Sequence, residues 1–100
     1  MKETKFYENG REIWELVDCS NDEMYFTIGL FLSLHDAIKA IDAYGKDEAI
    51  GEYSEGWEKV EIRKRKIGFS GVGEKVYERE RETYYDEEAD EYYWRTVKAS

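Results

Sequence analysis

The chain has 100 residues, of which 41% are apolar and 16% aromatic, so we expect one domain over residues 1–100 with a modest core. Its net charge of −9, with a pI near 4.7, argues against direct binding to nucleic acids or anionic membranes, because the field of the protein repels phosphates. No stretch approaches the roughly 18 consecutive apolar residues of a membrane helix, and the N-terminus lacks the apolar segment of a signal peptide.

The N-terminal third predicts three strands. Asn9-Gly10 stands between residues 6–8 and 11–17, and Asn-Gly readily takes the positive-φ pair that a two-residue hairpin requires. We therefore predict a short strand, a tight turn and a longer strand. Residues 20–23 form the next polar break, and the aromatic and β-branched residues over 24–32 predict a further strand.

A helix is predicted to follow. Ser33 and Asp36 match the acidic form of a capping box, because the Ser oxygen accepts a free backbone N–H while Asp36 favours the positive helix end. Gly45 suits the left-handed cap that ends the helix, after about three turns. Residues 46–56 are polar and predict a loop. The apolar stripe of this helix consists of Leu34, Ala37, Ile38, Ile41 and Tyr44.

From residue 57 onward the apolar residues alternate with period two, which is typical of strands. We predict an antiparallel meander of three strands over 57–69, 74–85 and 91–98. If the loop over 70–73 sets the register, Arg65 faces Glu78 and Arg63 faces Glu80, and such opposed charges contribute roughly 0.2 to 1 kcal/mol each. The predicted fold class is α+β, a single small domain in which one α-helix packs on one face of a twisted antiparallel sheet of about five strands.

The most distinctive segment joins the last two predicted strands, where a block of carboxylates lies between two aromatic clusters. Residues 74–91 hold nine acids and three bases. This acidic loop is either a solvated hairpin tip that keeps the protein soluble, or a ribbon that imitates spaced phosphates and occupies a basic protein. The candidate partner-binding residues are Glu78, Glu80, Glu82, Tyr85, Asp86, Glu87, Glu88, Asp90, Glu91 and Tyr92.

Aromatic residues are too numerous in this region for one small face to bury them all. In Tyr84-Tyr85 and Tyr92-Tyr93, successive side chains point to opposite faces of the sheet, so one of each pair is expected to lie away from the helix. Exposed aromatic residues flanked by charge are typical of interface anchors.

The sequence holds no recognisable catalytic or metal-binding arrangement. The only histidine, His35, falls in the first helical turn, and a single His with a single Cys cannot make a zinc site. Counted from Asp86, the acidic loop lacks the Gly and the bidentate acid of a calcium-binding EF-hand. We therefore expect no catalytic, metal or cofactor-binding residues and no enzymatic activity.

Two functional hypotheses follow, and no motif identifies a family. Being small, acidic and poor in cysteine, the chain is similar to inhibitors encoded by phages and mobile elements, including anti-CRISPR and anti-restriction proteins. That similarity implies a non-enzymatic module that occupies a basic, nucleic-acid-handling protein by DNA mimicry. The alternative is a self-associating structural or adaptor protein that uses the aromatic sheet face as a homodimer interface. Cys19 alone cannot form an internal disulfide, which favours the cytoplasm.

Overall fold

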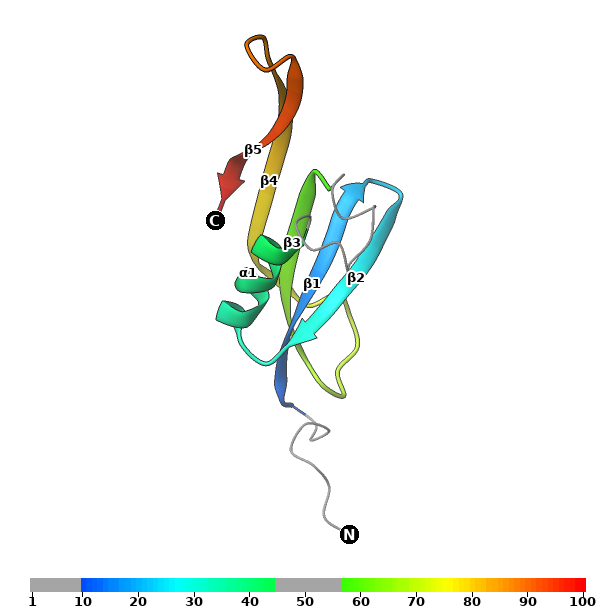
Figure 1. Cartoon of the computed structure of the whole chain (residues 1–100). Helices are drawn as coiled ribbons and strands as arrows, with labels where there is room; N and C mark the ends of the chain where they lie inside the picture. Colours follow the sequence, from blue (N-terminus) through cyan, green and yellow to red (C-terminus); the bar gives the residue numbers. More distant parts are fainter. Residues whose placement is uncertain (1–9, 45–56) are drawn as a thin grey trace.

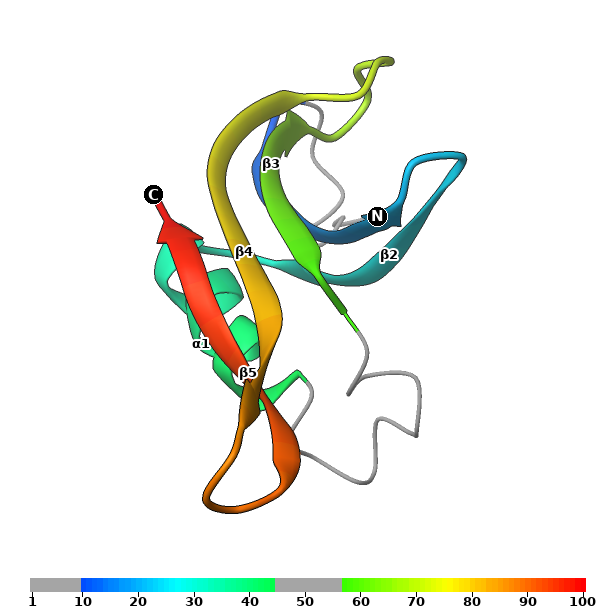
Figure 2. The same cartoon turned by 90° about the horizontal axis from the view of Figure 1, so that it is seen from above.

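The computed structural model describes residues 10–44 and 57–100. In this part, the elements are β1 (Glu12–Asn21), β2 (Met24–Phe31), α1 (Leu34–Ala43), β3 (Lys59–Lys66), β4 (Glu74–Asp86) and β5 (Glu91–Ala99). The strands form one open, twisted antiparallel sheet in the order β2-β1-β3-β4-β5. Helix α1 packs on one face of this sheet (Figures 1 and 2). The predicted α+β architecture, with its C-terminal meander, is confirmed.

The N-terminal strands differ from the prediction in their bounds. The predicted strand over 6–8 lies outside the described residues, as does the loop over 46–56. The predicted strand over 11–17 continues to Asn21, so the hairpin turn between β1 and β2 falls at residues 22–23. The extension pairs with β2 as far as Asn21 and Met24, and Ser20 supports it, because its Oγ accepts hydrogen bonds from the backbone N–H groups of Glu58 (2.7 Å) and Lys59 (3.2 Å). These bonds tie the end of β1 to the start of β3.

The predicted helix is confirmed at its N-terminus and along its buried face. Ser33 has extended backbone angles, and its Oγ accepts the backbone N–H of Asp36 at 3.1 Å, which is the part of the capping box that Ser33 supplies. Ala37 and Ile41 are fully buried, and the other stripe residues pack against the core. The backbone N–H of Tyr44 donates to the last helical carbonyls. The predicted cap at Gly45 lies outside the described residues.

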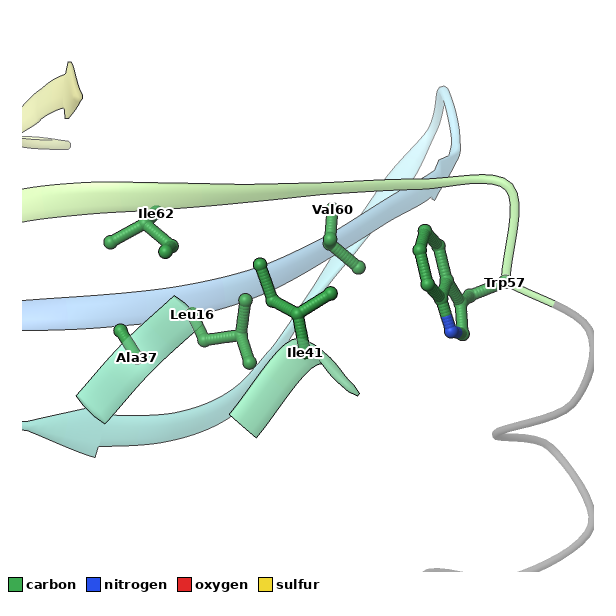
Figure 3. Packing of buried hydrophobic residues seen from close by; sticks show 6 residues of the cluster. All are labelled: Leu16, Ala37, Ile41, Trp57, Val60 and Ile62. Carbon is green, nitrogen blue, oxygen red and sulfur yellow. The ribbon is translucent and has the colours of Figure 1, made fainter. Parts of the chain in front are cut away.

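The hydrophobic core lies between α1 and the central strands. Figure 3 shows Ala37 and Ile41 of α1 next to Leu16 of β1 and facing the β3 residues, with Trp57 at one end. The indole N–H of Trp57 donates to the backbone carbonyl of Tyr44 at 2.9 Å, which joins the residue before β3 to the end of the helix. The buried cluster consists of Leu16, Ala37, Ile41, Trp57, Val60 and Ile62.

The predicted register between the third and fourth strands is wrong. Glu78 faces Glu61 rather than Arg65, Glu80 faces Lys59, and Arg63 faces Lys75. The reason is that β3 ends at Lys66, which leaves a longer connection over 67–73 than the predicted loop over 70–73.

Glycines in this connection make the longer path possible. Gly68, Gly71 and Gly73 all have positive φ angles, between 76° and 111°. A Cβ atom at Gly73 would also lie 2.8 Å from the backbone oxygen of Lys64. The chain therefore folds closely over the end of β3 before β4 begins. In the resulting register, the core residue Ile62 lies opposite Tyr77.

Candidate functional site

The distal halves of β4 and β5 form a two-stranded ribbon that extends beyond the rest of the sheet. Strand β3 pairs with β4 only from Glu74 to Glu80, whereas β5 pairs with β4 as far as Asp86. Residues 81–96, which we call the ribbon, therefore have no third strand beside them in the described structure. Figure 1 shows this hairpin, in orange and red, projecting past the ends of the other strands.

Asp86 shapes the turn at the tip of the ribbon. Its Oδ1 accepts hydrogen bonds from the backbone N–H groups of Glu88 (3.0 Å) and Ala89 (3.3 Å), and its backbone oxygen accepts the N–H of Asp90 (2.8 Å). Asp90 takes a positive φ of 55°, a conformation that Asp tolerates better than most residues. The predicted acidic loop is thus an ordered turn, in which Asp86 has a structural role.

Four tyrosines form two cross-strand pairs behind this turn. Tyr84 and Tyr93 have ring centroids 6.0 Å apart, and Tyr85 and Tyr92 have theirs 5.1 Å apart. Because successive strand residues point to opposite faces, the two pairs lie on opposite faces of the ribbon. All four are exposed, from 38% for Tyr84 and Tyr93 to 72% for Tyr92. One pair thus lies away from the helix, as the sequence predicts.

Two of the tyrosines contact the acids near the tip. The hydroxyl of Tyr85 donates to Oδ1 of Asp90, and this hydrogen bond raises the pKa of Tyr85 above its usual range. The hydroxyl of Tyr93 donates to Oε2 of Glu91 at 3.0 Å. The tip therefore combines exposed aromatic rings with exposed carboxylates that the rings help to orient.

Arginines hold the base of the ribbon. The guanidinium of Arg81 lies between two indole rings, 3.9 Å from the centroid of Trp57 and 4.2 Å from that of Trp94, and its Nε donates to the backbone oxygen of Trp57 at 2.6 Å. Arg95 donates to the carboxylate of Glu82 through Nε (2.9 Å) and Nη2 (2.6 Å). Burial lowers the pKa of Arg81. The sequence reasoning missed the Arg81 stack, since its three residues are far apart in the chain.

The candidate residues nearer the body of the sheet are engaged in ion pairs. Glu78 is only 5% exposed, and its carboxylate contacts Lys75 (3.1 Å), Lys59 (3.7 Å) and Lys98. Hydrogen bonds from Lys98 and Lys75 lower the pKa of Glu78 to about 2. Glu80 lies 3.8 Å from Lys59. Both acids are thus separated from the tip.

The structure divides the ten candidate residues into two groups. Glu78 and Glu80 belong to the sheet, and Glu82 is paired with Arg95 at the base of the ribbon. The tip brings together the remaining candidates, which are Tyr85, Asp86, Glu87, Glu88, Asp90, Glu91 and Tyr92.

Two further buried acids were not anticipated. Glu15 accepts hydrogen bonds from the hydroxyl of Thr27 (2.6 Å) and from Arg65 (3.1 Å), and Glu61 pairs with Arg63 (2.7 Å). Arg65 thus pairs with β1 rather than with β4. The sequence did not predict these ion pairs, because the alternation of apolar and polar residues does not show which strands are neighbours or in which register they pair.

A pocket of about 330 Å³ lies beside the ribbon base, at the end of α1. Two of its arginines already have carboxylate partners, because Arg79 pairs with Asp42 at 2.5 Å and Arg95 pairs with Glu82. Its lining residues are Ile41, Asp42, Tyr44, Trp57, Arg79, Arg81, Trp94, Arg95 and Thr96.

The single histidine and the single cysteine of the chain lie outside the ribbon, on α1 and β1. His35 is exposed in the first turn of α1, as predicted. Cys19 is buried, and burial with the nearby charge of Glu61 raises its pKa to about 11, so its thiol stays protonated at neutral pH. Over residues 10–44 and 57–100, no group of three or more His, Cys, Asp or Glu side chains could hold a metal ion. Helix α1 of this part is too short to cross a membrane.

Comparison with known proteins gives no relative: no protein-family model matches the chain, and neither a curated protein nor a solved structure shows significant similarity to it.

Proposed function

We propose that the protein is a non-enzymatic protein-binding module that docks the tip of its ribbon into a basic surface of a partner. The observation that supports this most is the exposure of tyrosines on both faces of a ribbon that no third strand among residues 10–44 and 57–100 accompanies. An isolated two-stranded hairpin is at best marginally stable in water, and exposed aromatic clusters are characteristic of interfaces. A partner would bury these rings and supply the missing packing.

Charge supports a basic partner. Residues 82–95 hold six acids and one base, and the exposed acids of the tip project from a chain with a net charge of −9. Such a field attracts a basic surface and raises the association rate. Glu78 and Glu80 are left out of the proposed contact, because lysines already neutralise them.

In its more specific form, the proposal is that the partner handles nucleic acid in the cytoplasm and that the ribbon inhibits it by occupying its basic groove. Two sequence features support this form: the concentration of acids in one segment, which resembles spaced phosphates, and the lone cysteine. The inhibitors of phages and mobile elements offer the analogy.

An affinity capture from the host extract, with partners identified by mass spectrometry, tests the proposal. Surface plasmon resonance at two salt concentrations then compares the protein with the variant Glu87→Gln/Glu88→Gln. Neither side chain caps the turn, so the variant is expected to fold, to associate more slowly and to show a flatter salt dependence.

The matched control is Asp22→Asn/Glu23→Gln, which removes two exposed charges from the turn between β1 and β2. It changes net charge equally but lies in the β1–β2 turn rather than at the tip of the ribbon. If both double variants associate at the same rate, the tip does not steer the partner and the proposal fails.

Self-association is the second candidate function, and the same exposed tyrosines favour it, because two ribbons could bury their tyrosines against each other. Sedimentation velocity over a range of concentrations distinguishes the two. A dimer that Tyr92→Ser dissociates would favour self-association over capture of a basic partner.

A further inference from the structure

One face of the ribbon already binds an arginine of the chain itself. The guanidinium carbon of Arg95 lies 5.2 Å from the ring centroid of Tyr84, whose cross-strand neighbour is Tyr93. The same guanidinium donates two hydrogen bonds to the carboxylate of Glu82. A tyrosine pair and an acid on the ribbon therefore hold one guanidinium by ring contact and charge together.

The opposite face presents a second tyrosine pair, which borders the acidic turn. Tyr85 and Tyr92 form the closer of the two pairs, at 5.1 Å, and are 47% and 72% exposed. Within the described residues, no Lys or Arg lies over either ring. The exposed acids Glu87 and Glu88 follow Tyr85 within three positions, and in the described structure their side chains take part in no ion pair.

Arginine fits this arrangement better than lysine does. Its planar guanidinium can contact a ring with one face while its N–H groups donate to a carboxylate, whereas an ammonium is a compact, strongly hydrated charge. The chain itself follows this preference. Over the described residues, the arginine guanidinium carbons lie 3.9 to 5.8 Å from the ring centroids that they contact, and the lysine pair, Lys66 with Phe69, has a separation of 6.0 Å.

We propose that the Tyr85–Tyr92 face of the ribbon is a binding site for an arginine side chain of the partner, and that the ribbon distinguishes arginine from lysine there. The inference rests on the proposed function and adds to it the chemistry of the partner, an arginine-bearing protein segment. Charge complementarity favours this occupant, since the acids of the tip repel phosphate and carboxylate groups.

Two peptides of equal charge test the inference. Each is acetylated and amidated and alternates glycine with four arginines or four lysines. Titration followed by the aromatic NMR signals of Tyr85 and Tyr92, at fixed ionic strength, gives both dissociation constants. We expect the arginine peptide to bind about two- to fivefold more tightly, the gain typical of exposed cation–π contacts.

Two single variants separate the ring contact from the charge. Tyr92→Leu removes a ring without changing charge, and should bring the ratio of the two dissociation constants down to about one, with little effect on the lysine peptide. Tyr25→Leu is the matched control, because Tyr25 is similarly exposed, at 58%, but lies on β2 at the far edge of the sheet. It should leave the ratio unchanged.

Each remaining outcome decides against the inference. Equal binding of both peptides that depends on Glu87 and Glu88 would overturn arginine recognition while leaving the charge-based function intact. If neither peptide shifts the tyrosine signals, both proposals fail. Shifts of Tyr85 and Tyr92 with protein concentration alone would assign this face to a second copy of the chain.

Discussion

At the scale of single residues, the sheet face that carries Glu78 shows how buried charges are accommodated. Glu61 and Glu78 lie directly opposite each other on β3 and β4, an arrangement that like charges normally disfavour. Lys59 relieves the repulsion, because its ammonium lies 3.7 Å from each carboxylate. Lys75 and Lys98 add to the positive charge around Glu78. The surrounding lysines therefore favour the ionised form of Glu78.

This cluster predicts a specific dependence of stability on pH. The pKa of Glu78 is lowered from 4.5 to about 2, so its contribution is present above about pH 4.5 and disappears as the pH falls through 2. Glu78→Gln should lower the unfolding free energy at pH 7 by about 1 to 2 kcal/mol, because the partly exposed lysines are screened by water. Urea denaturation at several pH values measures this.

The control is Glu74→Gln, which removes an exposed acid from the same strand and should change stability by less than about 0.5 kcal/mol. A deficit of the Glu78 variant that stays constant between pH 7 and pH 2.5 would contradict the assigned role of its charge.

The buried face of α1 gives a second residue-scale prediction. Ile41 is 1% exposed within the core cluster, so Ile41→Ala should cost about 2 to 4 kcal/mol through lost burial and the cavity that it leaves. Lys39→Ala, on the exposed side of the same helix, should change stability little. Urea denaturation of both variants checks the orientation, and similar losses would show it to be wrong.

At the scale of elements, Arg81 joins the ribbon to the body of the protein. Its guanidinium contacts one tryptophan that precedes β3 and another on β5. Removing this side chain takes away both stacking contacts and the hydrogen bond to the backbone of Trp57. Since β3 does not reach the ribbon, the loss should loosen the ribbon before it affects the core.

Hydrogen exchange of Arg81→Ala tests this separation. We expect faster exchange of the β5 amides that bond to β4 within the ribbon, with a local loss of about 1 to 3 kcal/mol and unchanged protection in β1. Arg95→Ala is the control, because Arg95 is more exposed and its ion pair with Glu82 and its contact with the Tyr84 ring both lie within the ribbon. Equal loss of protection in β1 and β5 would mean that the ribbon is not an independent unit.

The sequence predicts elements well where local chemistry decides them. The helix was predicted from Ser33, Asp36 and one apolar stripe, and the meander from period-two alternation. The β3–β4 register was not predicted. It depends on three positive-φ glycines and on the pairing of Ile62 with Tyr77, and both are set by tertiary structure rather than by the local sequence. The position of the acidic turn between β4 and β5 followed from the sequence. The neutralisation of Glu78 did not, since its lysines come from three separate parts of the chain.

At the scale of the whole molecule, the two edges of the sheet differ in charge. Edge strand β2 has no charged residue, and Met24, Tyr25, Phe26 and Leu30 on it are more than half exposed. The opposite edge, β5, carries one acid, Glu91, and two bases, Arg95 and Lys98. A bulge near Ile28 interrupts β2, which limits but does not abolish its ability to pair with another strand. Repulsion between chains of net charge −9 opposes such pairing at neutral pH.

This asymmetry predicts how the protein aggregates. Near the pI of 4.7 the electrostatic repulsion between chains vanishes, so the protein should aggregate above a threshold concentration, which light scattering measures. Phe26→Lys, opposite Asp18 on β1, should raise the concentration at which scattering begins. Val97→Lys adds the same charge on β5, where Val97 is 51% exposed. Equal protection by the two variants would show that net charge alone, rather than the β2 edge, controls aggregation.

The continuity of β4 has a mechanical consequence. Its first half is hydrogen-bonded to β3 inside the sheet, and its second half forms one strand of the ribbon. A partner that pulls the tip along the strand direction therefore loads the β3–β4 hydrogen bonds in shear, all at once, rather than opening them one after another. The hairpin should therefore resist unfolding when a force pulls on its tip, because that force is shared among the hydrogen bonds between β3 and β4.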